Sequence, residues 1–119
     1  GDFHVEVDSL NINLNKRAQA YVYAQINTGA LDMEGNSSLT MEGTSERLQA
    51  NLLDMAKYRG ESMQIGSCQL KIAGNANARV YAFSDIRINA TGGASIFLYG
   101  TPNITITEFL DTVQLIKKQ

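Results

Sequence analysis

The stretch RINATGGASIFLYGTPNITITEF, Arg87–Phe109, decides the fold class of this chain. Apolar residues, mostly isoleucine, alternate in it with polar ones, and Gly-Gly, Tyr-Gly and Thr-Pro interrupt the alternation. Successive side chains of a β-strand point to opposite faces, so each alternating run predicts a strand with one apolar face. The glycines and the proline predict turns between these strands. No obviously reactive group stands in the stretch.

The same alternation recurs along the rest of the chain, whereas helical periodicity is rare. The best helical candidate, Asn51–Tyr58, is short and fits equally well a strand through Leu53 and Met55. The alternating runs are four to six residues long, and most are bounded by Gly, Asn, Ser or Thr. We therefore predict an all-β chain of short strands: LNINL, YVYAQI, SLTME, RLQAN, CQLKI, ARVYA, DIRIN, SIFLY, NITIT and TVQLI.

Inward apolar pairs recur along the chain as two ladders. One ladder has steps of 22, 16 and 18 residues, and the other has steps of 25, 18 and 17. The longer early steps predict an insertion at Lys57–Gly66, which we expect to protrude as a loop. The first ladder is Leu48 and Ala50, Leu70 and Ile72, Ile86 and Ile88, Ile104 and Ile106; the second is Leu53 and Met55, Ala78 and Val80, Ile96 and Leu98, Val113 and Leu115.

A repeat of about 16–18 residues with two one-sided strands cannot bury its own apolar face, so it must stack on a neighbour. This pattern predicts a single-stranded parallel β-helix, a solenoid of short coils, as one domain over residues 1–119. An antiparallel β-sandwich also fits short alternating strands, but it gives no reason for a spacing of 18 residues. Turn-forming residues fall at the expected corners: Gly74, Asn75, Asn77, Gly92, Gly93, Gly100 and Pro102.

Composition excludes several classes of partner. Charged residues make up 18% of the chain, against about 25% in an average soluble domain. The net charge is -2 and the ten basic residues are scattered, which argues against binding to nucleic acid or to an anionic membrane surface. No apolar run approaches the roughly 18 residues that span a bilayer, so no direct membrane insertion is expected. The opening GDFHVEV lacks the pattern of a signal segment.

The residue types needed for catalysis are sparse. Cys68 shares a strand face with Leu70 and Ile72, which predicts a buried apolar side chain rather than a reactive thiol. His4 is the single histidine and lies near a terminus, which argues against a Ser-His-Asp triad and a multi-histidine metal site within one chain. We expect no catalytic residues, no metal and no cofactor. The acids that could serve polysaccharide cleavage follow no common register: Asp54, Glu61, Asp85, Glu108 and Asp111.

The outward residues of the second ladder are more informative. If Val80 stacks on Leu98, three aromatic side chains and a guanidinium lie in adjacent rungs. Cross-strand aromatic pairs stabilise a sheet by about 0.2 to 1 kcal/mol each, so one interpretation is a stabilising ladder. The other is a binding surface, because exposed aromatic patches mark contacts with proteins or sugars. The candidate surface-binding patch is Arg79, Tyr81, Phe97 and Tyr99.

Two further groups of side chains are expected to point outward. Tyr21 and Tyr23 flank the inward Val22 and would extend an aromatic surface. Lys71 is predicted to lie beside Arg87 in the first ladder, as a solvated basic pair.

The segment AGNANARVYAFSDIRINATGGASIFLYGTPNITI, Ala73–Ile106, resembles the GIN-domain family, the auto-transporter adhesin head domains of the bacterial cell envelope. Its members repeat a Ser-Gly-Ser-Gly corner before an alternating strand and close with a Tyr-Gly-Asn-Pro-like turn. IFLYGTP, Ile96–Pro102, matches the closing turn, and Gly74–Ala82 matches a corner and strand. The corners Asn75–Asn77 and Thr91–Ala94 depart from the pattern. The resemblance extends from about Leu39 to the end and is weaker before it.

The resemblance implies a right-handed parallel β-helix, exported to the cell surface or periplasm, without known catalytic residues. The leading interpretation is a non-enzymatic binding module that presents a flat sheet face to a protein or glycan. The alternatives are a structural element that acts by self-association and a degenerate polysaccharide-cleaving β-helix enzyme. Lys117 and Lys118 would place charge at the C-terminal coil, and the N-terminal coil shows no evident cap. Homo-oligomers through coil ends or a sheet face are therefore expected.

Overall fold

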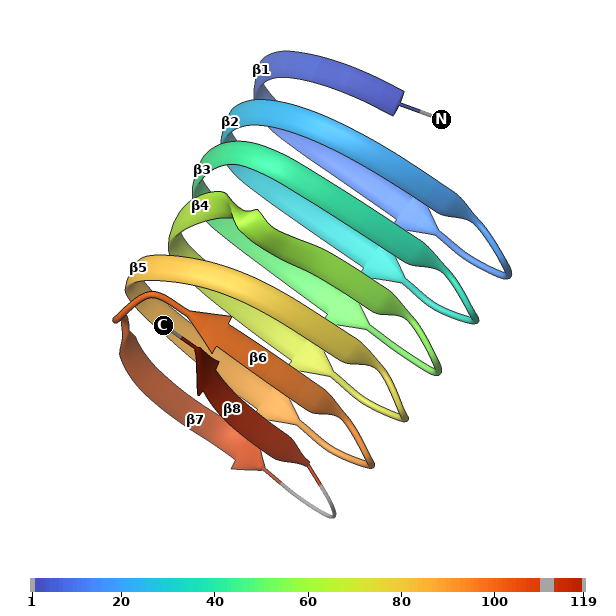
Figure 1. Ribbon diagram of the computed structural model, residues 1–119, viewed down its shortest axis with the longest axis vertical. Helices are drawn as coiled ribbons and strands as arrows, with labels where there is room; N and C mark the ends of the chain where they lie inside the picture. The colour runs from blue at the N-terminus through green and yellow to red at the C-terminus, as the bar shows by residue number, and fades with distance from the viewer. Residues whose placement is uncertain (1, 110–112, 119) are drawn as a thin grey trace.

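A computed structural model shows a parallel β-solenoid (Figure 1). It describes residues 2–109 and 113–118, and the side chains of residues 6–107 and 113–117. All strands join one sheet, with the order β1-β2-β3-β4-β5-β6-β8 and β7 paired to β5. No helix occurs in the described part, so none there is long enough to cross a membrane. The strands are β1 Asp2–Leu14, β2 Gln19–Met33, β3 Ser38–Leu52, β4 Lys57–Ile72, β5 Asn77–Ala90, β6 Ser95–Tyr99, β7 Asn103–Phe109 and β8 Gln114–Lys118.

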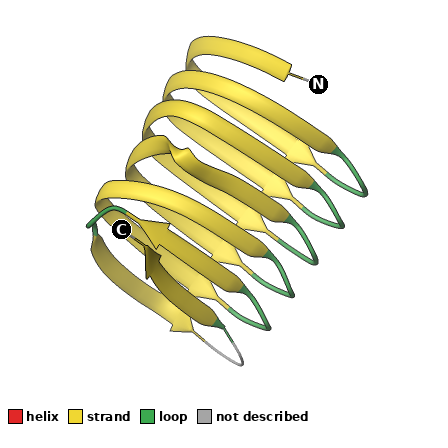
Figure 2. Ribbon diagram, in the orientation of Figure 1, coloured by secondary structure: helices red, strands yellow, loops and turns green. Residues whose placement is uncertain are grey.

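Each long strand forms most of one coil. It runs along one side of the molecule, bends, and returns along the other side to a tight corner; Figure 2 shows the corners as loops stacked at one end. In Figure 1 the first halves lie on the near side and the second halves behind them, and the descending path is right-handed. We call these sides the near face, which includes β6 and β8, and the far face, which includes β7. The predicted short strands therefore fuse in pairs: SLTME and RLQAN are both parts of β3.

Successive coils repeat at close to 19 residues, from the first coil onward. The cross-strand neighbours in one column are 19, 19, 20, 18 and 19 residues apart: Tyr21, Thr40, Arg59, Arg79, Phe97 and Ile116. The parallel β-helix predicted from the sequence is confirmed, and it starts earlier in the chain than the ladders indicated.

Two steps of the predicted ladders are confirmed. Ala78 and Val80 pair with Ile96 and Leu98, and the pair Ile86–Ile88 lies opposite Ile104–Ile106. The earlier steps of the first ladder are wrong by two residues.

Leu48 lies opposite Cys68 and Ala50 opposite Leu70, and Leu70 lies opposite Ile88 rather than Ile86. A shift of two residues leaves every side chain on its own face, so the apolar pattern cannot detect it.

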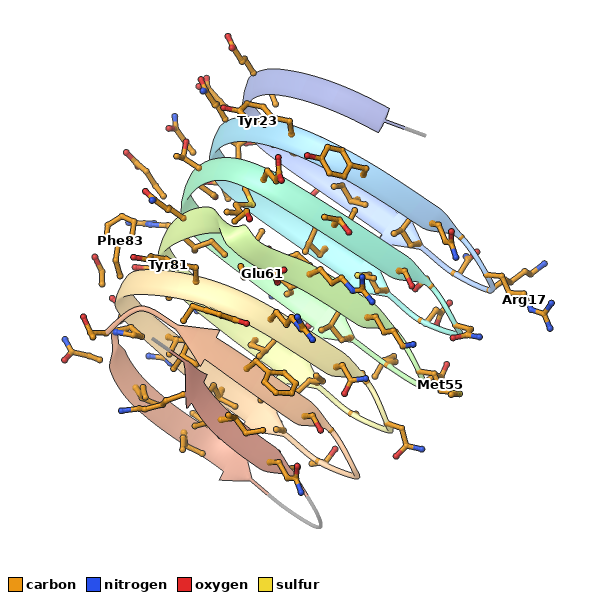
Figure 3. The ribbon with its side chains drawn as sticks, viewed as in Figure 1. Arg17, Tyr23, Met55, Glu61, Tyr81 and Phe83 are labelled. Atoms are coloured by element: carbon orange, nitrogen blue, oxygen red, sulfur yellow. The ribbon has the colours of Figure 1, made fainter. Side chains whose placement is uncertain are left out.

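The ends of the second ladder are also wrong. Leu53 and Met55 are 41% and 54% exposed at a corner, and Figure 3 shows Met55 at that corner. Their predicted place opposite Ala78 is taken by Tyr58. At the other end, Ile96 pairs with Leu115 instead of Val113.

The corners have a common construction. Each ends on a small, inward residue, and four of these are fully buried: Ser37, Ala56, Ala76 and Ala94. Their carbonyl oxygens accept hydrogen bonds from the first amide of the strand in the next coil, for example Lys57 N to Ser37 O at 2.9 Å. Two positions before the small residue, the backbone is left-handed in every corner described, at Lys16, Gly35, Asp54, Gly74 and Gly92.

The predicted insertion at Lys57–Gly66 is a bulge within β4 and not a protruding loop. Gly60 pairs with Val80 and Gln64 with Tyr81, so Glu61, Ser62 and Met63 have no counterparts in β5. Figure 1 shows the resulting kink in the β4 ribbon. The pairing with β3 also shifts there, between Thr40 and Glu42.

Tyr58 explains why a glycine stands just before the bulge. It is 1% exposed, and a Cβ built on Gly60 would lie 2.2 Å from its hydroxyl oxygen. The ring therefore occupies the space that a side chain at 60 would fill. The hydroxyl lies 3.9 Å from Met63 Sδ, a weak contact. Burial, with smaller contributions from Cys68 and Glu61, raises the pKa of Tyr58, so this hydroxyl stays neutral.

The core is a set of apolar columns between the near and far halves of the coils. Leu, Ile, Met and Ala side chains fill it, and those of β2–β6 are almost completely buried. Leu10, Ile12 and Leu14 of β1 are only partly buried. Lys117 continues the inward column of Leu98 but is exposed. It lies within β8, whereas the sequence pattern placed it after the last strand.

Candidate functional site

The candidate patch lies on the near face, over β5 and β6. We call Arg79, Tyr81, Phe97 and Tyr99 the aromatic–arginine face. Arg79 is directly opposite Phe97, and Tyr81 is directly opposite Tyr99. The guanidinium carbon of Arg79 lies 5.4 Å from the centre of the Phe97 ring, which is within cation–π range. The sequence prediction that these four residues occupy adjacent rungs is confirmed.

Alternation in β5 and β6 explains why these side chains point outward. Ala78, Val80 and Ala82 are 0% exposed and face the core, so Arg79 and Tyr81 must face solvent. Arg79 is exposed, and the three aromatic side chains are partly buried by their neighbours. They are held by a rigid sheet, so the face needs little ordering to meet a ligand.

A hollow of about 290 Å³ adjoins the aromatic–arginine face on the side of β4. Arg59 lies directly opposite Arg79, and Lys57 lies opposite Asn77. Lys57 and Arg59 were not predicted as site residues, because the sequence pattern placed both in a protruding loop. The lining residues are Lys57, Tyr58, Arg59, Asn77, Arg79, Ser95 and Phe97.

Tyr21 and Tyr23 do share the near face but lie farther up the solenoid. Tyr21 is in the same column as Arg79, with Thr40 and Arg59 between them. Its hydroxyl donates a hydrogen bond to the Glu42 carboxylate. The two tyrosines therefore extend the sheet face without adjoining the aromatic–arginine face.

The far face is polar and carries a shallower hollow of about 200 Å³. The predicted pairing of Lys71 with Arg87 is wrong: Arg87 lies opposite Gln69, and Lys71 lies opposite Asn89. The cause is the two-residue register shift described above. Both cations still line this hollow, together with Gln49, Asn51, Gln69, Leu70, Asn89 and Thr107.

The residues considered for catalysis do not converge where the structure describes them. Asp54 sits at a corner, where its carboxylate accepts a hydrogen bond from Gly35 N at 3.1 Å. Asp85 lies beyond the bend in β5 and accepts one from Ser67 Oγ at 3.2 Å. Glu61 is in the β4 bulge. Asp111 and the side chains of His4 and Glu108 lie outside the described residues.

Cys68 is buried, as predicted. Burial, with a smaller contribution from Asp85, raises the pKa of its thiol to about 12. The thiol is therefore protonated at neutral pH and is a poor nucleophile. Among the described residues, no three His, Cys, Asp or Glu side chains gather in a group that could hold a metal ion.

The comparisons with known proteins identify a family. A family model described as "Putative auto-transporter adhesin, head GIN domain" matches residues 1–102. The match includes the first 38 residues, where the sequence resemblance is weak, and it ends at residue 102, whereas the resemblance was expected to extend to the end of the chain. No curated protein and no solved structure matches the chain.

Proposed function

Because the chain belongs to the GIN-domain family of auto-transporter adhesin heads, we propose that it is a non-enzymatic binding module of the cell surface or periplasm. Its aromatic–arginine face contacts the ligand, a protein or a glycan. The family name describes adhesin-like, exported proteins, which supports both the kind of activity and the location.

One observation carries the choice of site. The guanidinium of Arg79 over the Phe97 ring, beside the Tyr81–Tyr99 pair, gathers aromatic area and a charge on one rigid surface. Tyr and Arg are enriched at the residues that dominate binding energy in interfaces. The hollow of the far face is lined by amides, a hydroxyl and the cations Lys71 and Arg87, without an aromatic side chain.

The test is a double substitution, Tyr81→Ala with Tyr99→Ala, assayed on a glycan array and for adhesion to host-cell and envelope proteins. We expect binding to fall at least tenfold while the thermal unfolding midpoint changes by only a few degrees, since a cross-strand pair contributes about 0.2 to 1 kcal/mol. The matched control is Gln49→Ala with Gln69→Ala, a pair in adjacent rungs of the far face. Unchanged binding by the tyrosine variant, or equal loss in the control, would contradict the proposal.

The same experiment separates the other hypotheses. A large loss of stability without any ligand phenotype would favour a purely structural ladder. Association in solution that the tyrosine substitutions abolish would favour assembly through this sheet face. Turnover of an acidic polysaccharide that disappears in Asp54→Asn or Asp85→Asn would favour an enzyme.

A further inference from the structure

We infer that the ligand of the near face is an acidic polysaccharide, whose carboxylate or sulfate groups bind in the hollow between Lys57, Arg59 and Arg79. We call these three residues the cation cluster. This inference rests on the proposed function, because the cluster shares Arg79 and Phe97 with the aromatic–arginine face. It goes further by naming the chemical class of the ligand.

Two like charges stand in direct opposition within the cation cluster. Arg59 and Arg79 are cross-strand partners, and neighbouring parallel strands lie about 4.8 Å apart. Like charges in this position repel and destabilise a sheet. Lys57, two residues along the same strand, adds a third positive charge. An anion between them would replace this repulsion with attraction.

No carboxylate stands beside the cation cluster in the lining of the hollow. The seven residues that line the hollow include three cations and no carboxylate. The molecule as a whole carries a net charge of -2, so the charge of this site is opposite in sign to that of the whole chain.

The groups around the hollow also match the shape and chemistry of a sugar acid. Guanidinium groups bind carboxylate or sulfate oxygens through paired, charge-assisted hydrogen bonds. Asn77 and Ser95 supply an amide and a hydroxyl beside the cations, which suit sugar hydroxyls. Phe97, whose ring stacks with the Arg79 guanidinium, adds apolar surface to the lining of the hollow. A ligand with acidic groups, hydroxyls and some apolar surface can contact the cations, the polar side chains and the aromatic ring together.

An acidic peptide fits this site less well. Peptides bind sheets mainly along an edge, where their backbone completes the ladder of hydrogen bonds. The hollow lies over β4, β5 and β6, inside the sheet, where each strand is already paired on both sides. Only side chains are available there, so a peptide backbone would lose its hydration without gaining partners.

The experiment compares polymers that differ in a single property. The probes are polygalacturonate, its fully methyl-esterified form, heparin and poly-L-glutamate, with affinity measured by biolayer interferometry on the intact chain at low and at physiological salt. We expect polygalacturonate or heparin to bind at least tenfold more tightly than the methyl ester. Affinity should also fall as salt rises, because exposed charges are screened.

The variant Lys57→Gln with Arg59→Gln spares the aromatic–arginine face; it should weaken binding to the acidic polymer at least tenfold, leave binding to the methyl ester unchanged and not lower the unfolding midpoint. Lys71→Gln with Arg87→Gln removes the same net charge from the far face and should leave all affinities unchanged. Equal binding to the ester, equal loss in the far-face control, tighter binding to poly-L-glutamate, or no binding to either acidic polysaccharide would overturn the inference.

The two proposals can fail separately. If the Tyr81→Ala, Tyr99→Ala variant loses binding to a neutral glycan or a protein while the Lys57→Gln, Arg59→Gln variant binds every acidic polymer as the parent does, only the acidic-polysaccharide inference is wrong. If the tyrosine variant binds every probe as the parent does, the aromatic–arginine face is not the binding surface and the proposed function is wrong.

Discussion

At the scale of single residues, the left-handed position of each corner is conformationally constrained. Lys16 and Asp54 adopt it with φ of 59° and 62°, although a side chain there costs roughly 1–2 kcal/mol. The Asp54 carboxylate offsets part of this cost by accepting the Gly35 amide. Gly92 has φ of 79°, and a Cβ there would lie 2.7 Å from the carbonyl oxygen of Gly74.

We therefore predict that Gly92→Ala lowers the free energy of unfolding by about 2 kcal/mol, since it combines φ strain with a close backbone contact. Gly93→Ala is the matched control. Its position in the other corners holds residues with side chains, Asn36 and Asn75 among them, and its φ is not positive. The control should be neutral or stabilise by up to about 1 kcal/mol. Urea denaturation of both variants decides the matter; equal midpoints would contradict a role for strain.

At the scale of the element, β4 differs from β5 in how two inward positions share the space in the core. Its inward pair is Tyr58 and Gly60, and the pair opposite in β5 is Ala78 and Val80. In β4 the first position carries a large side chain and the second carries none. In β5 the two positions carry a small and a medium-sized side chain. The tyrosine ring lies over Gly60, and its hydroxyl reaches Met63 in the bulge.

This exchange predicts strong coupling between the two positions. Tyr58→Ala alone should cost about 3 kcal/mol or more, because it leaves a cavity. Gly60→Val alone should cost about 1–3 kcal/mol, because its side chain collides with the ring. The double variant, which copies β5, should be more stable than the sum of the two losses by at least about 1 kcal/mol. A double-mutant cycle from chemical denaturation measures the difference, and additive losses would refute the exchange.

The same element shows how far sequence reasoning can reach. Alternation predicted the strands and their inward faces, and the regular coils around Ala78 and Ile96 gave the correct register. The prediction for Leu53 and Met55 was wrong because the alternation of apolar residues continues through a corner, where the backbone leaves the strand. Tyr58 was missed as a core residue because the bulge interrupts its alternation after two positions.

At the scale of the whole molecule, a solenoid is held together by contacts between successive coils. Such a chain behaves as a row of units whose stability depends on the nearest neighbours. The interior coils β3–β5 are packed on both sides, whereas Leu10, Ile12 and Leu14 of β1 are only partly buried.

We predict a gradient of amide hydrogen exchange along the solenoid axis. The amides of Leu70 and Ile88 should exchange at least about tenfold more slowly than those of Ile12 and Ile104, because terminal coils can open without disrupting the interior. Leu70→Ala should accelerate exchange at Ala50 and Ile88, its neighbours in the adjacent coils, more than at Ile12. Uniform rates would mean that the whole solenoid opens in a single step.

Most of the candidate site was predictable because it lies in the regular coils, where alternation gave the correct register. The four residues of the aromatic–arginine face follow from the register of β5 on β6 alone. The cation cluster could not be predicted, because placing Arg59 opposite Arg79 requires the true length of the bulge. Like-charged neighbours also run against the usual preference of cross-strand pairs, so no pairing rule would have suggested them.

The stacking of coils has one consequence for how this surface changes over evolutionary time. The backbone ladder fixes the distance between rungs at about 4.8 Å, whatever side chains the rungs carry. Substitutions on the near face can therefore change which chemical groups are exposed, while the distance between neighbouring rungs stays constant. The near face therefore displays side chains at a regular spacing, and a polymer of repeating units is the kind of ligand that can contact several rungs at once.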